Sequence, residues 1–224
     1  MMINSFKPHL EILSKSQQQL WKQLAPASEL GLVLYGGTAI ALQLGHRQSV
    51  DFDFFSEKKL DKDLLRATFF FFENATLLQD REETLTLLVP FENETPVKIS
   101  FFGNLQFGRV DSPRQTNDGI LQVASLDDLM ATKLKVLFQR VEAKDYIDIA
   151  AMIQHGVSLA YGLAGASLMF GSLFQPSECL KALTYFRGGD LELLTKETKD
   201  TLIQAATALH DLPQVHLQSS QLSV

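Results

Sequence analysis

Two aspartates, Asp51 and Asp53, are the residues whose types and spacing point most directly to chemistry. They lie in the run 49–55, where apolar residues stand between and beside them. Side chains of a strand alternate between its two faces, so the spacing predicts a strand with both carboxylates on one face. The alternative is a half-exposed strand that is acidic by chance, but two aspartates on one face repel each other unless a cation lies between them. Paired carboxylates suit Mg²⁺ ions, which commonly bridge to nucleotide phosphates.

A glycine pair, Gly36 and Gly37, precedes these aspartates at the end of an apolar run. The pattern predicts a strand over 32–35, a tight turn, a helix over 38–44 and a second strand over 50–55. A glycine turn that opens a helix presents backbone N–H groups and the positive end of the helix dipole, which together attract phosphate. An ordinary strand-to-helix turn with positive φ is the alternative. The aspartates that follow favour phosphate binding.

A second group of charged residues occurs later in the chain. Lys133 and Arg140 are seven residues apart in a largely apolar stretch, which predicts that they share one face of a helix. Asp145 and Asp148 are three apart and share a face in the same way. The basic residues here favour either local contact with RNA or a solvated helix surface with ion pairs, and the sequence leaves both open.

Composition excludes several classes of protein. The 224 residues are 46% hydrophobic, enough for one domain or two small ones, and the net charge of −6 argues against a general nucleic-acid coat protein. No run is long and apolar enough to span a bilayer, and no secretory signal is visible, so we expect a cytoplasmic protein without membrane contact. Cys179 is the only cysteine, which excludes an internal disulfide, and we expect it to be buried and inert, with Trp21 also in the core.

The order of patterns predicts an α+β fold, with strands before about residue 122 and helices after it. We expect a nucleotide-site core with an N-terminal helix over 1–122 and a helical C-terminal region over 123–224. The tail from residue 213 is rich in Gln and Ser, which predicts a frayed end. The four phenylalanines 69–72 are predicted to form core or one wall of an interface. The other predicted elements are helices over 8–24 and 60–71, antiparallel strands over 76–80, 84–89 and 97–102, and helices from 125 and over 143–154, 159–170, 177–186 and 195–211.

The order of motifs in this chain resembles the signature of the DNA polymerase beta-type nucleotidyltransferase superfamily: Gly-Gly-Thr, a helix, Arg47-x-Ser49 and Asp-hydrophobic-Asp. Within it, the chain is most similar to the AbiEii/AbiGii-type toxin nucleotidyltransferases. The resemblance resumes over 129–137 and 140–149, and it fades after the second acidic block. It implies a nucleotidyltransferase fold with a small mixed or antiparallel sheet, backed by a C-terminal helical bundle that closes the nucleotide cleft.

The resemblance also implies an activity, which is Mg²⁺-dependent (or Mn²⁺-dependent) two-metal transfer of a nucleoside monophosphate from an NTP to an acceptor hydroxyl. It implies that the acceptor is the 3′ end of a tRNA and that a cognate antitoxin protein restrains the enzyme as part of a toxin–antitoxin system. The implied roles are metal binding by Asp51 and Asp53, nucleotide binding by Gly36, Gly37, Thr38, Arg47, Ser49 and Arg140, and catalysis by Lys133 with Asp148 or Asp145.

One departure from the superfamily pattern leaves alternatives open. Members generally carry a third carboxylate on a later strand, and Ser100 stands at the corresponding position here. We therefore hypothesise that Asp148, or else Asp145, activates the attacking hydroxyl. The first rival function is a protein-modifying enzyme on the same scaffold, which would add a nucleotide or phosphoryl group to a side chain. The second is a non-catalytic module that binds nucleotide or a partner. Thr38 could either contact phosphate or cap its helix.

Overall fold

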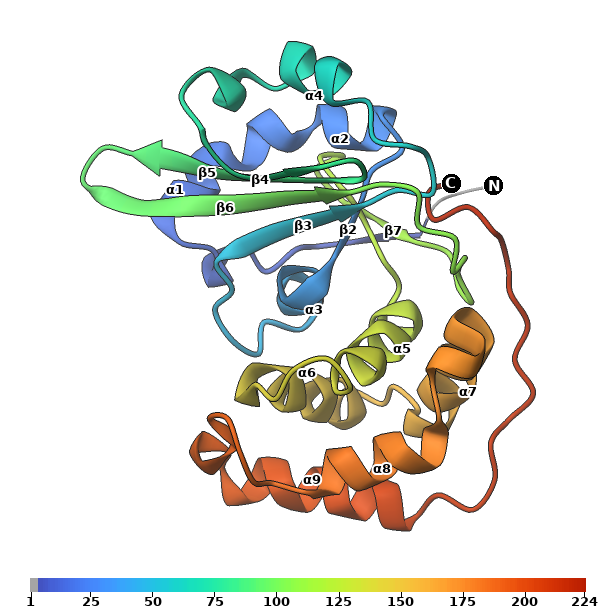
Figure 1. Ribbon diagram of the computed structural model, residues 1–224. Helices are drawn as coiled ribbons and strands as arrows, with labels where there is room; N and C mark the ends of the chain where they lie inside the picture. The colour runs from blue at the N-terminus through green and yellow to red at the C-terminus, as the bar shows by residue number, and fades with distance from the viewer. Residues whose placement is uncertain (1–3) are drawn as a thin grey trace. The chain divides into compact units, whose positions relative to one another are not determined.

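The computed structural model describes residues 4–224, which form two compact units (Figure 1). Among the described residues, unit 1 consists of 4–108, Ser112–Ser125 and Ser219–Val224. Unit 2 consists of Arg109–Asp111 and Leu126–Gln218. Within residues 4–224, none of the helices combines the length and the apolar character that crossing a bilayer requires.

Unit 1 is built on one sheet, in which the described residues contribute eight strands in the order β1-β7-β8-β2-β3-β6-β5-β4. β3 pairs with β2 antiparallel and with β6 parallel, whereas β4, β5 and β6 form the antiparallel hairpins that the sequence predicts. The strands are β1 (Ser5–Phe6), β2 (Val33–Tyr35), β3 (Asp51–Phe55), β4 (Thr76–Arg81), β5 (Thr84–Phe91), β6 (Glu94–Phe102), β7 (Arg114–Thr116) and β8 (Gln122–Val123).

The two faces of this sheet have different chemistry. One face carries Phe52 and Phe54 of β3 beside Phe101 of β6, and all three are fully buried. Trp21 and Phe69 pack over this face, with ring centroids 6.5 Å from Phe52 and 5.7 Å from Phe101, so Trp21 belongs to the core as predicted. Figure 1 shows α1, α2 and α4 on this side of the sheet and α3 on the other. The opposite face of β3 carries Asp51, Asp53 and Phe55, whose ring packs 4.6 Å from that of Tyr35 and 5.3 Å from that of Phe102.

Two helical regions of unit 1 differ from the sequence prediction because the helices in them are shorter. The predicted helix over 8–24 is wrong, because Ser14 caps a new helix by accepting a hydrogen bond from the N–H of Gln17 in a capping box. The predicted helix over 60–71 also ends early, because Phe69 has an extended backbone. The helical elements are η1 (Leu10–Ile12), α1 (Lys15–Leu20), η2 (Trp21–Leu24), α2 (Pro26–Glu29), α3 (Gly36–Leu44), α4 (Lys62–Thr68) and η3 (Phe70–Glu73).

Unit 2 is helical. The predictions over 143–154 and 159–170 are confirmed, because they coincide with α6 and α7. Gly162 of α7 lets this helix approach α5 closely, since a β-carbon added there would lie 2.2 Å from the Cγ atom of Met130. The elements are α5 (Leu126–Val136), α6 (Ala143–Gln154), α7 (Leu159–Phe170), η4 (Gly171–Leu173), α8 (Pro176–Thr184), η5 (Leu191–Leu193) and α9 (Lys196–Thr207).

The end of the chain corrects another prediction. The tail was expected to be frayed, but Ser219–Val224 packs as part of unit 1 and the side chain of Leu222 is fully buried. The N–H of Leu222 donates to Oε2 of Glu57 at 3.1 Å, and the N–H of Val224 donates to Oε1 of Gln122 at 3.3 Å. The Gln and Ser content of the tail gives no sign of this packing, because Leu222 is the one buried residue of Ser219–Val224.

Candidate active site

The glycine turn lies directly against one of the two predicted metal ligands. α3 begins at Gly36, immediately after β2, and Gly36 has a φ of +76°. A β-carbon added at Gly36 would lie 2.8 Å from Oδ2 of Asp53, closer than real β-carbons approach other atoms. Glycine is therefore required at this position both by the backbone conformation and by the close approach of the carboxylate.

Asp51 and Asp53 project from the same face of β3, as their spacing predicts. The residues between and after them, Phe52 and Phe54, are buried on the opposite face. The side chain of Asp51 is 30% exposed, and Asp53 is half-buried. Both carboxylates consequently retain access to solvent beside the N-terminus of α3, whose leading N–H groups have no partner inside the helix.

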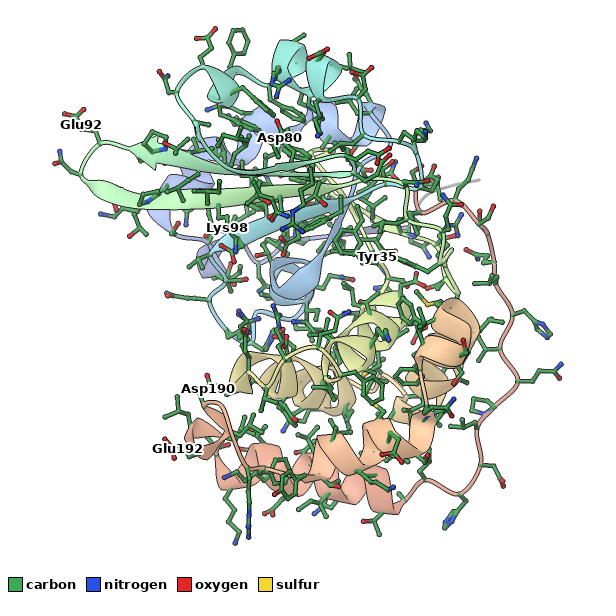
Figure 2. All side chains as sticks on the ribbon, viewed as in Figure 1. Tyr35, Asp80, Glu92, Lys98, Asp190 and Glu192 are labelled. Carbon is green, nitrogen blue, oxygen red and sulfur yellow. The ribbon has the colours of Figure 1, made fainter. Side chains whose placement is uncertain are left out.

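The neighbouring strand β6 supplies a lysine and a serine to this face. Register pairs Asp51 with Lys98 and Asp53 with Ser100. The Nζ atom of Lys98 lies 2.8 Å from Oδ2 of Asp51, while Ser100 is buried. Figure 2 shows Lys98 on the side of the sheet toward α3. Sequence reasoning located Ser100 but missed Lys98, although the same period of two places both on one face.

Thr38 and Ser49 brace the turn between α3 and β3. The hydroxyl of Thr38, which is 2% exposed, lies 2.7 Å from the hydroxyl of Ser49 and also donates to the carbonyl oxygen of Asp51. Thr38 is the third residue of α3, and the N-cap is Tyr35, so Thr38 does not cap the helix. Arg47 is half-buried, and its guanidinium donates to the carbonyl of Gln48 at 2.8 Å.

The second predicted group of residues forms a buried ion cluster in unit 2. Nζ of Lys133 lies 2.7 Å from Oδ1 of Asp145 and 2.7 Å from Oδ2 of Asp148, and both carboxylates are fully buried. Arg140 donates from Nε to Oδ2 of Asp145 at 2.8 Å and from Nη2 to Oδ1 at 3.0 Å. Four of the predicted catalytic and nucleotide-binding residues therefore lie together in this cluster.

The prediction that Lys133 and Arg140 share a helix face is wrong. α5 ends at Val136, and the N–H groups of Phe138 and Gln139 donate three residues back in a tighter turn. Arg140 lies in the segment after this turn and meets Lys133 through the carboxylate of Asp145, rather than along one helix.

The electrostatics of the cluster follow from its burial and its charges. Burial alone would raise the pKa of Asp145, but the hydrogen bond from Arg140 and the charge of Lys133 outweigh it and hold the pKa below its ordinary value. Lys144 is 2.8 Å from Glu142, so it too has an acidic partner. These contacts favour the ion-pair interpretation of the basic residues in this stretch.

Cys179 is buried, as the sequence predicts. Burial raises the pKa of its thiol to about 12, so the thiolate that would act as a nucleophile is absent at neutral pH. The cysteine therefore takes no part in the candidate chemistry.

A divalent cation fits the acidic pair of unit 1 only with help from other ligands. Within residues 4–224, no group of three or more His, Cys, Asp or Glu side chains is placed to hold a metal ion. Asp51 and Asp53 offer carboxylate oxygens on one partly exposed face, beside a helix N-terminus that favours phosphate. Water and substrate phosphates would complete the coordination, which is how Mg²⁺ is commonly bound in nucleotide enzymes.

Solved structures with the same architecture define the class of this fold. A candidate nucleotidyltransferase from H. pylori superposes with a TM-score of 0.57 at 18% sequence identity, covering 87% of this chain and 94% of that one. MenT4, the nucleotidyltransferase toxin Rv2826c from Mycobacterium tuberculosis H37Rv, superposes with a TM-score of 0.55 at 14% identity, covering 87% of this chain and 83% of that one. The fold is therefore the α+β fold of nucleotidyltransferases, as predicted.

Sequence comparison identifies the family. The model of the nucleotidyl transferase AbiEii toxin family, described as part of a type IV toxin–antitoxin system, matches residues 19–209. The chain belongs to this family, which confirms the resemblance drawn from its motifs. An uncharacterised protein of Aquifex aeolicus (strain VF5) is 31% identical over 129 residues, a match that spans 56% of this chain and 60% of that relative.

Proposed function

We propose that this protein transfers a nucleoside monophosphate from an NTP to an acceptor hydroxyl and releases pyrophosphate. The observation that carries the proposal is the approach of the glycine turn at Gly36 to Asp53, with Asp51 on the same exposed strand face. Membership of the AbiEii nucleotidyl transferase family supports it. The acceptor oxygen would form a bond to the α-phosphorus, and the bond from that phosphorus to the bridging oxygen would break.

Asp51 and Asp53 would hold Mg²⁺ or Mn²⁺, and a pair of ions remains part of the proposal. When bound, the metal offsets negative charge on the phosphates as the leaving pyrophosphate forms. Gly36, Gly37 and Thr38 would bind the β- and γ-phosphates through their main-chain N–H groups at the start of α3. The Thr38 hydroxyl would hold the carbonyl of Asp51 in place, because that is its contact in the protein.

Two further residues of unit 1 belong to the proposal. Arg47 would contact phosphate through its guanidinium, which matches the geometry of phosphate oxygens. Ser49 would act by orienting Thr38, whose hydroxyl it contacts at 2.7 Å.

The ion cluster of unit 2 remains a proposed part of the machinery on the family resemblance. Lys133 would stabilise charge on the phosphates, Arg140 would assist nucleotide binding, and Asp148 would activate the acceptor hydroxyl, with Asp145 as the alternative. Full turnover by a folded Asp148→Asn variant would remove Asp148 from this role. Lys133 contacts both aspartates, so the fold of each variant must be checked by circular dichroism.

The acceptor and the partner are also proposals. The 3′ end of a tRNA is the proposed acceptor, and an antitoxin protein encoded beside the enzyme is the proposed partner. MenT4, whose fold this chain shares, is described as a nucleotidyltransferase toxin, and this description supports a growth-arresting role.

Label transfer tests the function. Purified protein with Mg²⁺ is mixed with each α-labelled NTP and with total RNA or cell protein, beside an Asp51→Ala/Asp53→Ala variant. Label on RNA with the wild-type protein alone supports the proposal and names the nucleotide. Label on protein instead favours the side-chain-modifying rival. NTP binding without transfer to any acceptor or pyrophosphate release favours the binding module.

A further inference from the structure

We infer that Lys98 makes divalent-cation binding at Asp51 depend on the nucleotide. In the free protein the ammonium group of Lys98 forms an ion pair with the carboxylate of Asp51. When the cation and an NTP bind together, this ammonium group moves to the triphosphate. The inference rests on the proposed function for the identity of the ligands, and it adds a substrate-binding residue that neither the motifs nor the family match assigns.

The position of Lys98 is fixed by the sheet. Lys98 and Asp51 are register partners on the parallel strands β6 and β3, and their charged atoms are 2.8 Å apart. A divalent cation bound to the same carboxylate would meet an ammonium at short range. Like charges this close repel, so the ammonium must leave before the cation can bind well.

The exposure of Lys98 allows such a movement. Its side chain is 41% exposed and that of Asp51 is 30% exposed, and exposed ion pairs of this kind are weak. Lysine also carries its charge on a flexible four-carbon chain, so the Nζ atom can change partners while the strand stays fixed. Lys133 lacks this freedom, because its side chain is 6% exposed and contacts two buried carboxylates.

The net charge of this strand face explains why the ammonium group of Lys98 would move to the triphosphate. Asp51 and Asp53 contribute two negative charges, Lys98 contributes one positive charge, and Ser100 adds none where a third carboxylate would otherwise stand. A bound cation makes this face positive and therefore favourable for a triphosphate beside the N-terminus of α3. The displaced ammonium group of Lys98 would then pair with phosphate oxygens of the bound triphosphate.

A pair of binding measurements tests the inference. The variant is Lys98→Met, and the control is Lys15→Met, which removes the same charge from a 79% exposed lysine paired with Glu94 at 3.4 Å. Mn²⁺ binding is followed by electron paramagnetic resonance, first without nucleotide and then with a non-hydrolysable NTP. We expect Lys98→Met to bind Mn²⁺ alone about five- to tenfold more tightly and the Mn²⁺–NTP complex about five- to tenfold more weakly. Lys15→Met should match the wild type in both.

Several outcomes overturn the inference. Unchanged or weaker binding of Mn²⁺ alone by Lys98→Met does so, and so does tighter binding of both Mn²⁺ and Mn²⁺–NTP, which would leave Lys98 merely repulsive. A wild-type protein that binds no Mn²⁺ with or without NTP also does so. If Lys98→Met fails to fold, judged by thermal denaturation, Lys98→Gln replaces it and the same shifts are required.

The fate of the inference can be separated from that of the proposed function. Label transfer by the wild type without reciprocal shifts in Lys98→Met overturns the inference alone. Reciprocal shifts in Lys98→Met, together with a wild-type protein that transfers label to no acceptor, leave the inference standing and overturn the proposed transferase activity.

Discussion

The two charged clusters of this protein use the same residue types in opposite surroundings. In unit 1, Asp51 and Lys98 form an ion pair on a partly exposed strand face. In unit 2, Lys133 lies between Asp145 and Asp148, both fully buried. The first pair can exchange its partners for ligands, whereas the second is closed to solvent and satisfied within the protein.

This difference predicts that substitutions at the two clusters are detected first in different measurements, although both clusters belong to the proposed machinery. A buried charge that loses its partner is strongly destabilising, so the unit 2 cluster must stay intact for the helices to pack. An exposed carboxylate loses little when its partner leaves, which makes it available to a metal ion. We therefore expect substitutions in unit 1 to reduce activity and substitutions in unit 2 to reduce stability first.

The largest expected effect is on activity in unit 1. Asp53→Asn removes a charged metal ligand, and we expect transfer to fall about 1000-fold, equivalent to a loss of about 4 kcal/mol in transition-state stabilisation. The melting temperature should change little because the side chain is only half-buried. Asp63→Asn, at a 96% exposed aspartate of the same unit, is the control and should keep full activity. An Asp53→Asn variant with wild-type turnover would contradict the assignment.

The next effect is on stability in unit 2. Lys133→Met leaves Asp145 and Asp148 with one fewer cation in a buried site, and we expect a loss of about 3–5 kcal/mol in the free energy of unfolding. Urea denaturation measures it. Lys181→Met, at a 73% exposed lysine of α8, should cost less than about 1 kcal/mol. Equal losses of unfolding free energy in the two variants would contradict the expected difference between buried and exposed ion pairs.

A smaller effect is expected at the glycine turn. Gly36→Ala forces a β-carbon against Asp53 in a backbone conformation that alanine avoids, and we expect a loss of about 2 kcal/mol with a marked fall in Mn²⁺ binding. Gly119→Ala is a matched control, because Gly119 has the same φ of +76° but no atom within 4 Å of the added carbon. The difference between the two variants measures the contact with Asp53 alone. If they behave alike, the close approach has no functional meaning.

The smallest effect is the acid dependence of the buried cluster. The pKa of Asp145 is lowered in the folded protein, so its contribution to stability is present above the unfolded value of about 4 and is lost as the pH falls through the folded pKa. We expect the free energy of unfolding to decrease below about pH 4. An Asp145→Asn variant should be less stable at neutral pH and should show a shallower decrease. An identical slope in the variant would show that other carboxylates account for it.

Most of the candidate site of unit 1 could be predicted from the sequence because it depends on local rules. Period-two alternation places Asp51 and Asp53 on one face, and a glycine pair after an apolar strand opens α3. Lys98 was missed because its partner lies 47 positions away, and the parallel pairing of β3 with β6 cannot be read from either strand alone.

Other features of the fold could not be predicted from local sequence patterns. β1, β7 and β8 have two or three residues each, too few for any period to be detected. Helical spacing continues past the end of α5, yet the chain turns after Val136. The burial of Asp145 and Asp148 is a tertiary property, since their spacing equally suits an exposed helix face.

The docking of Leu222 into unit 1 has a consequence for how the protein is made. Leu222 is synthesised about 170 residues after Asp51 and Asp53, and after the whole of Leu126–Gln218. The core of unit 1 therefore cannot be complete while unit 2 is being synthesised, because Leu222 is a fully buried part of it. The sheet that carries the candidate site gains this buried side chain only after the sequence of the helical unit has been made.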